Sequence, residues 1–321
     1  GNTVNFNLSN LSAPIAQANA ATSITTNSAT INGSVNPGNQ STTVVFNYGL
    51  TSSLGTEVSA AQSPVSGTTS TAVSTSLTGL LPNTTYYYQV KATNASDTAT
   101  SDIVSFKTNA LPPIATTNDA TSVTGSSATL NGTVTPHDTN VTVFFDYGST
   151  LSYGAPVTAD QSPLSGETAT AVTYSLTGLE PNTTYHFRVR AVNSGGTTNG
   201  DDLTFTTSKI APTATTGAAT SIGTTTAMLN GTVNASNDET TIYFEYGPDV
   251  TYGSTADANQ SPLNGLADTA VSADLTGLVD NSLYHYRVVA TNSAGTTYGT
   301  EQTLTTDLYP GVKINQAQIG S

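Results

Sequence analysis

The sequence predicts an all-β protein built from three similar β-sandwiches in tandem. Short motifs recur along the chain at a constant distance, which is the mark of a repeated structural unit. Within each repeat, runs that alternate apolar and polar residues are separated by Asn-Gly, Pro-Asn and other turn-forming pairs, as expected of short strands. No window shows an apolar period of 3.6 residues long enough to form a helix. We therefore expect seven short strands and one sandwich core in each repeat.

The repeat has a constant length. The tetrapeptide Leu-Thr-Gly-Leu begins at positions 77, 176 and 275, a step of 99 residues. The same step relates three Asn-Gly pairs, three Phe-x-Tyr-Gly motifs, three Gln-Ser-Pro motifs and three linker prolines, Pro14, Pro113 and Pro212. Three copies without an insertion or deletion indicate either a recent duplication or a spacing on which the molecule depends.

The repeat divides the chain into three modules and two tails. We expect the modules at residues 12–110, 111–209 and 210–306. A strand-like tail at 1–11 precedes them, and another at 307–321 follows them. With short Pro-containing linkers of constant length, the modules are expected to form a rod.

The strands of the first module can be assigned from its alternating runs. They are expected near Thr22–Ile24, Ala29–Val35, Thr42–Tyr48, Thr56–Ala60, Ala72–Leu77, Thr85–Thr93 and Ile103–Thr108. The sixth run shows the pattern most clearly, because successive side chains on a strand point to opposite faces. Tyr86, Tyr88 and Val90 are expected to face the core, and Tyr87 and Lys91 to face solvent or a partner.

The composition narrows the class of protein. Seven Lys and Arg residues against 21 Asp and Glu residues give a net charge of −14, and only 9% of residues are charged. Solubility must then rest on Thr, Ser, Asn and Gly, which suits a secreted or cell-surface protein. Scattered cations on an acidic chain cannot neutralise a run of phosphates, so nucleic acid and anionic lipid are not expected partners.

Two further observations exclude other classes of site. No apolar run approaches the roughly 18 residues of a membrane span, so no membrane insertion is expected. The chain contains no Cys, which excludes disulfides, thiolate metal sites and cysteine nucleophiles.

One stretch of each module carries a family resemblance. Residues 77–92 of the first module, which contain Leu-Thr-Gly-Leu and Pro-Asn-Thr-Thr-Tyr, resemble the region between strands E and F of fibronectin type III domains. The resemblance covers about residues 12–306. It implies an immunoglobulin-like sandwich with strands A, B and E facing strands C, C′, F and G. It also implies that one tyrosine of each module forms a tyrosine corner, the residues being Tyr86, Tyr185 and Tyr284.

The chain departs from the family at strand B. Members usually carry a core Trp on this strand, whereas this chain has no Trp and carries Gly33, Gly132 and Gly231 there. In this it resembles the Trp-less, Thr- and Asn-rich type of bacterial and archaeal surface proteins.

No arrangement of residues predicts catalysis, so we expect a protein that is not an enzyme and has no cofactor. His186 and His285 occupy the position held by Tyr87 in the first module, which favours a surface role over metal binding. His137 lies in a turn with no second histidine nearby. Calcium is the alternative, because several aspartates fall in turns, namely Asp97, Asp119, Asp138 and Asp249. Recurring Asn-x-Ser/Thr triplets are glycan acceptors only if the source cell glycosylates.

Outward-facing side chains on strands C and F are expected to form a small patch on each module. Such a patch is typical of contact with another protein or a glycan, and lateral packing is favoured over sugar binding. The residues are Tyr87, Phe144, His186, Tyr243 and His285.

The two tails are the basis of the functional hypothesis. The first alternates like the last strand of a module, and the second resembles a linker followed by a first strand. Apolar residues that would fill pockets of a partner are Val4, Phe6, Leu8, Leu308, Val312 and Ile314. Either each tail adds a strand to a neighbouring copy, which gives a head-to-tail homopolymer, or the chain is a segment of a longer array.

The sequence thus leads to two functional hypotheses. The first is a non-enzymatic extracellular structural protein, the subunit of a surface filament whose partners are copies of itself and, secondarily, surface glycans. The alternative is a spacer or a glycan-binding or adhesion module of a larger secreted enzyme or adhesin.

Overall fold

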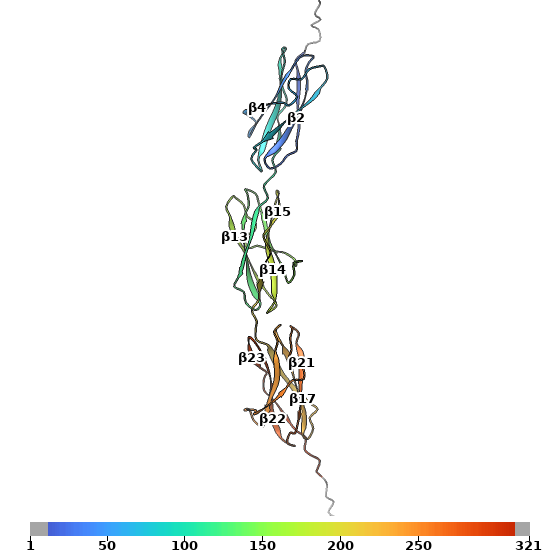
Figure 1. The fold of residues 1–321 in the computed structure, drawn as a ribbon, viewed down its shortest axis with the longest axis vertical. Helices are drawn as coiled ribbons and strands as arrows, with labels where there is room; N and C mark the ends of the chain where they lie inside the picture. Colours follow the sequence, from blue (N-terminus) through green and yellow to red (C-terminus); the bar gives the residue numbers. More distant parts are fainter. Residues whose placement is uncertain (1–11, 312–321) are drawn as a thin grey trace, which may run out of the picture.

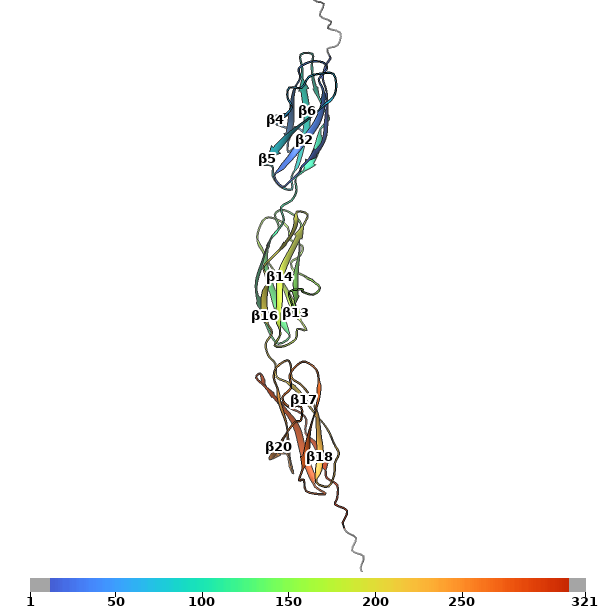
Figure 2. The same cartoon turned by 45° about the vertical axis from the view of Figure 1, so that its right-hand side comes forward.

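The computed structural model describes residues 12–311, which form three β-sandwiches joined end to end in a rod (Figure 1). A second view of the rod shows the same single file of modules, with the first and third at opposite ends (Figure 2). Every regular element in this range is a strand, so the prediction of an all-β fold is confirmed. Nothing within residues 12–311 forms a helix with the length and apolarity to cross a membrane.

Each module contributes eight strands. The first comprises β1 (Ile15–Thr22), β2 (Ser28–Asn36), β3 (Thr43–Gly49), β4 (Thr56–Ser59), β5 (Thr71–Thr78), β6 (Thr85–Thr93), β7 (Thr98–Thr100) and β8 (Val104–Lys107). The second comprises β9 (Ile114–Thr121), β10 (Ser127–Thr135), β11 (Thr142–Gly148), β12 (Val157–Thr158), β13 (Thr170–Thr177), β14 (Thr184–Asn193), β15 (Gly196–Asn199) and β16 (Leu203–Thr206). The third comprises β17 (Thr213–Thr220), β18 (Thr226–Asn234), β19 (Thr241–Gly247), β20 (Ser254–Asp257), β21 (Thr269–Thr276), β22 (Leu283–Asn292), β23 (Gly295–Tyr298) and β24 (Gln302–Thr305).

In each module a three-stranded sheet faces a five-stranded sheet. In the first, the order β1-β2-β5 packs against β4-β3-β6-β7, and β8 also pairs with β6. This is the predicted arrangement of A, B and E opposite C, C′, F and G. The seventh strand is divided into two pieces, β7 and β8, which both pair with β6.

The first strand of the module was misplaced by the sequence pattern. It was expected near Thr22–Ile24, but the structure places it at Ile15–Thr22. The segment is rich in Ala, which has a low strand propensity, and it is half exposed at the edge of its sheet, where a bulge interrupts its pairing between Asn19 and Thr22. Pairing with β2, rather than local preference, makes it a strand.

Each module has its own hydrophobic core between its two sheets. In the first module the largest fully buried side chains include Phe46 and Tyr88, on the adjacent strands β3 and β6. The three core clusters of residues 12–311 share no residue with one another. The modules are therefore separate packing units, and we expect each to unfold as its own cooperative unit.

The recurring Gln-Ser-Pro motif connects the two sheets of each module. In the first module, Ser63 Oγ accepts a hydrogen bond from the Val44 amide at 2.9 Å, and Gln62 Oε1 accepts one from the Ser74 amide at 2.7 Å. Val44 lies on β3 and Ser74 on β5, which belong to opposite sheets. The other two modules repeat both bonds, so the motif has a structural role.

The tyrosine corner implied by the resemblance is present in all three modules. The hydroxyl of Tyr86 accepts a hydrogen bond from the Leu81 amide at 2.9 Å. Tyr185 accepts the equivalent bond from Glu180 at 3.0 Å, and Tyr284 does so at 3.0 Å as well. Each bond fixes the loop that leads into strand F.

Replacing Tyr185 with Phe should destabilise the second module by about 1–2 kcal/mol, because the Glu180 amide loses its partner. Thermal unfolding followed by calorimetry measures this loss. Tyr174→Phe is the matched control, since the Tyr174 hydroxyl makes no hydrogen bond within residues 12–311. Equal unfolding temperatures for the two variants would contradict a stabilising role for the corner.

Candidate functional site

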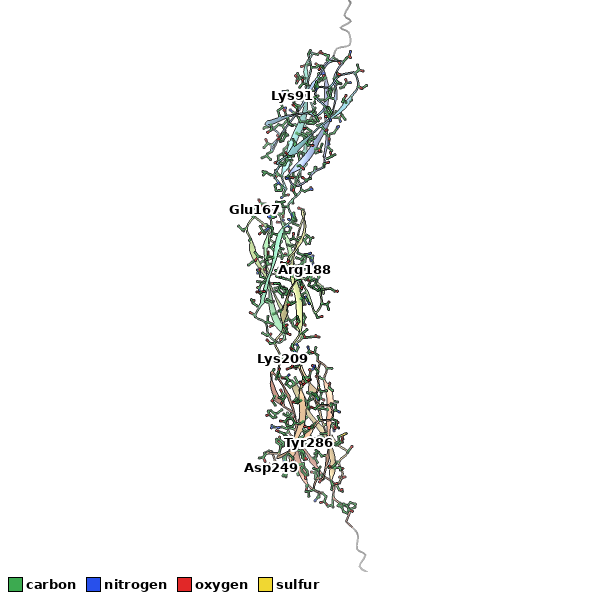
Figure 3. All side chains as sticks on the ribbon, in the orientation of Figure 1. Lys91, Glu167, Arg188, Lys209, Asp249 and Tyr286 are labelled. Carbon is green, nitrogen blue, oxygen red and sulfur yellow. The ribbon has the colours of Figure 1, made fainter. Side chains whose placement is uncertain are left out.

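The outer face of the five-stranded sheet carries the densest group of charged side chains in the second module. Asp146 on β11 is 7% exposed and lies between two arginines of β14. Its carboxylate accepts hydrogen bonds from Arg188 Nε at 3.1 Å and from Arg190 Nε at 3.0 Å. Figure 3 shows Arg188 in the middle of the module. One carboxylate thus holds two cations that would otherwise repel each other.

Aromatic rings lie beneath these two guanidinium groups. The Arg190 guanidinium carbon is 4.6 Å from the centre of the Phe144 ring, and that of Arg188 is 4.8 Å from the centre of the Tyr153 ring. These are the distances of cation–π contacts. The arginines therefore cover one face of each ring.

Tyr153 also belongs to a chain of hydrogen bonds along the same face. Its hydroxyl donates to Asp202 Oδ1 at 2.7 Å, and Asp202 Oδ2 lies 2.8 Å from His186 Nδ1. Burial and the bond to Asp202 raise the pKa of Tyr153 to about 12. Burial alone would raise the pKa of Asp202, but the hydrogen bonds from Tyr153 and His186 outweigh it and lower this pKa.

The third module repeats the arrangement with different residues. Arg287 pairs with Glu245 at 2.7 Å and lies over two tyrosine rings, Tyr252 at 4.8 Å and Tyr298 at 4.2 Å. His285 Nδ1 lies 2.5 Å from a carboxylate oxygen of Glu301. In the first module the equivalent positions of Asp146, Tyr153 and Arg188 hold the uncharged Asn47, Leu54 and Gln89.

In the second and third modules, the residues predicted to form a patch are not opposite each other in the strand ladder. Phe144 lies opposite Arg190 in the ladder, whereas His186 lies opposite Gly148, four residues further along β11. Tyr243 and His285 are separated in the same way, and Tyr87 lies opposite Gly49. The expected apolar patch is therefore interrupted by arginine in modules two and three. The five residues are all half-buried.

This face offers little chemistry to a substrate. Four of its carboxylates, those of Asp146, Asp202, Glu245 and Glu301, are paired with arginine, histidine or tyrosine of the same module. None of the histidines or acidic residues within 12–311 forms a group of three that could hold a metal ion. Of the four aspartates considered for calcium, Asp119 lies on strand β9 and the other three lie in separate loops. Asp249 Oδ1 accepts both donors of Thr251, which lowers the pKa of Asp249.

The recurring Asn-x-Ser/Thr asparagines act as hydrogen-bond donors within the fold. Asn32 Nδ2 donates to the Ala20 carbonyl at 2.9 Å and to Thr22 Oγ1 at 3.0 Å, which supports the bulge in β1. Asn131 and Asn230 repeat these bonds. The Asn83 and Asn182 amides donate across the junctions between modules.

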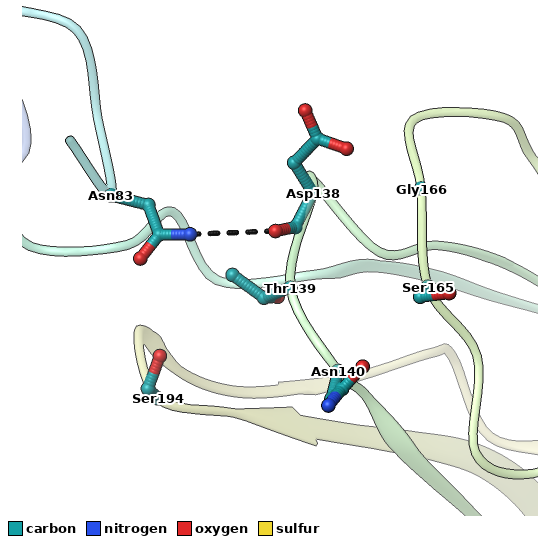
Figure 4. A pocket seen from close by; sticks show the side chains of 7 residues that line it. All are labelled: Asn83, Asp138, Thr139, Asn140, Ser165, Gly166 and Ser194. Carbon is teal, nitrogen blue, oxygen red and sulfur yellow. Dashed lines mark hydrogen bonds between the residues drawn. The ribbon is translucent and has the colours of Figure 1, made fainter.

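The junctions between modules contain contacts that the sequence did not reveal. Asn83 Nδ2 donates to the Asp138 carbonyl at 3.4 Å across the first junction (Figure 4), and Asn182 Nδ2 donates to the Asn237 carbonyl at 2.6 Å across the second. The available signal was the Pro-Asn-Thr that the E–F loops of the first two modules share, which the sequence pattern explains equally well as a turn. His137, in the facing loop, lies with Nδ1 2.8 Å from the Pro112 carbonyl oxygen.

Most predicted tail residues lie outside the described range. Val4, Phe6, Leu8, Val312 and Ile314 are in residues 1–11 and 312–321. Leu308 is described and is 67% exposed. Strand addition by the tails stays a prediction.

The sandwich topology and the tyrosine corners define the class as tandem immunoglobulin-like modules. The family model described as the fibronectin type III domain matches residues 118–206, nearly all of the second module. The other two modules repeat its strands, sheet order and corner, so the chain consists of three tandem modules that are similar to fibronectin type III domains.

Comparison with curated proteins gives partial matches. The chain is 32% identical over 244 residues to Exoglucanase B of Cellulomonas fimi, a match that covers 71% of this chain and 20% of that protein. It is 31% identical over 220 residues to Endoglucanase B of the same organism, covering 61% and 20%. It is 27% identical over 218 residues to the receptor-type tyrosine-protein phosphatase eta of Gallus gallus, covering 67% and 14%. The matches span a fifth or less of each of these relatives.

A solved structure of the FN1–FN3 domains of chicken CNTN1 matches with 18% identity and a TM-score of 0.28. The match covers 92% of this chain and 98% of that chain.

Proposed function

We propose that the chain is a non-enzymatic extracellular spacer, a rod of three modules that holds apart whatever is attached to its two ends. The observation that carries this proposal is the anchoring of the linkers. Ser208 donates its amide to Thr124 of the second module at 3.0 Å, and the Ile210 carbonyl accepts from Asn292 of the third at 2.9 Å. Only Lys209 lies between these anchors.

The first linker is anchored in the same way. Asn109 donates its amide to Thr25 at 2.9 Å, and the Leu111 carbonyl accepts from Asn193 at 2.8 Å, with Ala110 between them. A linker without free residues limits the range of angles between its modules. The repeated anchoring supports an extended shape that persists in solution.

The comparisons favour a spacer over an enzyme. The glucanases and the phosphatase are several times longer than the part that resembles this chain, so such arrays occur as portions of larger proteins. The paired charges on the outer faces of the modules leave no group of residues suited to acid–base or metal chemistry. The low charge and the abundance of Thr, Ser, Asn and Gly fit an extracellular location.

Small-angle X-ray scattering of the chain tests the spacer proposal. At about 3.3 Å per residue along a strand, each module spans about 30–35 Å and the rod about 100 Å. Six Gly-Ser residues inserted after Ala110 and after Lys209 should broaden the distance distribution and shorten its mean. A compact particle, or a profile unchanged by the insertions, would overturn the proposal.

A homopolymer is the second candidate, and the end modules supply the observation that favours it. Asn39 of the first module is equivalent to Asp138 and Asn237, and Asn281 of the third is equivalent to Asn83 and Asn182. Both are exposed within residues 12–311, so the first and third modules carry on their outer loops the asparagines that form junctions elsewhere in the rod. Electron microscopy of negatively stained native material, with intact mass measured in parallel, tests this. Filaments of single-chain subunits support it, and isolated particles contradict it.

A further inference from the structure

The second junction is held from both sides. Asn182 donates to the Asn237 carbonyl at 2.6 Å, and the Asn237 amide donates back to the carbonyls of Pro181 at 3.2 Å and Asn182 at 3.3 Å. It also lies 3.2 Å from Thr183 Oγ1. The E–F loop of the second module and the B–C loop of the third are thus joined reciprocally.

The first junction lacks the reciprocal half. Its one hydrogen bond between modules, among residues 12–311, runs from Asn83 Nδ2 to the Asp138 carbonyl at 3.4 Å. Asp138 is the counterpart of Asn237, but a carboxylate has no proton to donate to the facing carbonyls. In Figure 4 its carboxylate points away from Asn83. The change from Asn to Asp at one position explains the difference.

Packing at the first junction is also loose. An open cavity of about 670 Å³ lies beside the Asn83–Asp138 contact, and a second of about 430 Å³ lies on its other side, lined in part by His137 and Glu167. Figure 3 places Glu167 at this junction. Within the described residues, the two loops are thus flanked by open space and joined by a single hydrogen bond.

An ion pair further restrains the second junction. Lys209 Nζ lies 2.8 Å from Asp238 Oδ1 and 3.0 Å from Ser293 Oγ, so the linker side chain is attached to the third module. The equivalent residues at the first junction are the uncharged Ala110, Thr139 and Ser194. Hydrogen bonds from Lys209 and Ser293 lower the pKa of Asp238 from its ordinary value of 3.8.

We propose that the chain is an articulated rod, in which the first junction is the bending point and the second and third modules move as one rigid unit. The inference rests on the proposed spacer function and specifies where the spacer bends. The inference concerns the angles at each junction. It can therefore be tested even if the rod proves shorter or longer than the spacer proposal expects. A spacer built in this way would let its first module reorient while the other two stay aligned.

Paired spin labels measure the two junctions with the same geometry. The chain has no Cys, so labels can be placed on Thr43→Cys with Thr142→Cys, and on Thr142→Cys with Thr241→Cys. The three positions are equivalent, exposed and located on strands. Pulsed dipolar spectroscopy on the full chain should give a distance distribution about twice as broad for the first pair as for the second, as expected for a weak domain interface. Equal widths, or a narrower first pair, would overturn the proposal.

Isosteric exchange of the key residue provides the matched test. Asp138→Asn should narrow the first distribution, because the new amide can donate to Pro82 and Asn83. Asn237→Asp, and separately Lys209→Ala, should broaden the second. Circular dichroism confirms that each variant is folded, and if one exchange fails to fold, the other two still decide. Widths unchanged by the folded variants would refute the assignment of stiffness to these residues.

The Lys209–Asp238 contribution also has a defined pH dependence. Because the pKa of Asp238 is lowered in the folded protein, the ion pair restrains the junction fully above the ordinary aspartate value of 3.8. It is lost as the pH falls through the lowered value. The second distribution should keep its width from pH 7 to pH 4 and broaden only in stronger acid, and Lys209→Ala should abolish this change.

Discussion

Phe187→Ala is expected to destabilise the second module strongly while leaving the stability of its neighbours unchanged. The Phe187 ring is fully buried and packs against Phe205 with the ring centres 5.8 Å apart. Removing a buried Phe costs about 3–5 kcal/mol, through lost transfer energy and the cavity left behind. For a module of about 100 residues, this lowers the unfolding temperature by about 15 °C or more.

Calorimetry of the full chain distinguishes this outcome from a collapse of the whole molecule. One of the three unfolding transitions should move, because the cores share no residue. Phe144→Ala is the matched control: it removes the same ring from the outer face of the same sheet, where Arg190 covers it, and should cost about 1 kcal/mol. A common shift of all three transitions would show that the modules are energetically coupled.

The fold could be predicted from the sequence wherever the burial of side chains follows the alternation of apolar and polar residues along a strand. The run from Thr85 to Thr93 was expected as a strand with Tyr86, Tyr88 and Val90 inward, and β6 has these bounds and this burial. The alternation is enough to predict which side chains of this strand are buried, because every second side chain of a strand points to the same face. The Ala-rich β1 could not be located in this way, since its strand character comes from pairing with β2 and from no preference of its own residues.

The contacts of the candidate site could be predicted only with knowledge of the strand register. Phe144 and His186 share the outer face of adjacent strands, which the alternation predicts. Whether they touch depends on how β11 is aligned with β14, and the sequence pattern does not fix that alignment. The observed register places Arg190 beside Phe144 and Gly148 beside His186.

The contacts at the junctions between modules were even less predictable from the sequence. The Asn83–Asp138 and Asn182–Asn237 contacts join loops of different modules, so no period within one module reports them. The difference between Asp138 and Asn237 is visible in the sequence, but it acquires meaning only once the facing carbonyls of the preceding module are placed. Comparing repeats position by position is therefore useful mainly after the structure is known.

Comparison of the repeats reveals one buried amide that the modules satisfy in two ways. In the second module, the Val189 amide donates to Thr117 Oγ1 at 3.2 Å, and the third module repeats this bond. Gly200 lies directly against Thr117, because a Cβ there would be 2.4 Å from Thr117 Oγ1. The Thr117 hydroxyl thus fits in this position because residue 200 has no side chain.

The first module exchanges the two partners. Its positions equivalent to Thr117 and Gly200 hold Ala18 and Ser101, and the Val90 amide donates to Ser101 Oγ at 3.0 Å. In the first module, the hydroxyl that accepts from this amide therefore belongs to Ser101, which stands at the position of Gly200, and not to the residue at the position of Thr117. Buried backbone amides are rarely left unpaired, so each module must keep one of the two solutions.

The Ala and Ser of the first module should therefore be tolerated at the equivalent positions of the second module only when both residues are exchanged. Thr117→Ala alone should cost about 1–3 kcal/mol, because the Val189 amide loses its acceptor. Gly200→Ser alone should cost about 1–3 kcal/mol, because its Cβ collides with Thr117 Oγ1 and with the Thr117 backbone nitrogen, 2.6 Å away. In the double variant the collision with the hydroxyl is removed and the new serine accepts from Val189, but the backbone nitrogen of residue 117 must still shift away from the new Cβ, so part of both losses should be recovered.

Urea unfolding of the four proteins, followed by a probe in the second module, gives the coupling energy between the two positions. We expect about 2 kcal/mol or more in favour of the double variant, which is well above the deviation seen for independent sites. The same pair of changes in the third module, Thr216→Ala with Gly299→Ser, serves as a replicate because its geometry is the same. If the single losses simply add in the double variant, the two residues do not compensate for each other, and the alternation between modules has another cause.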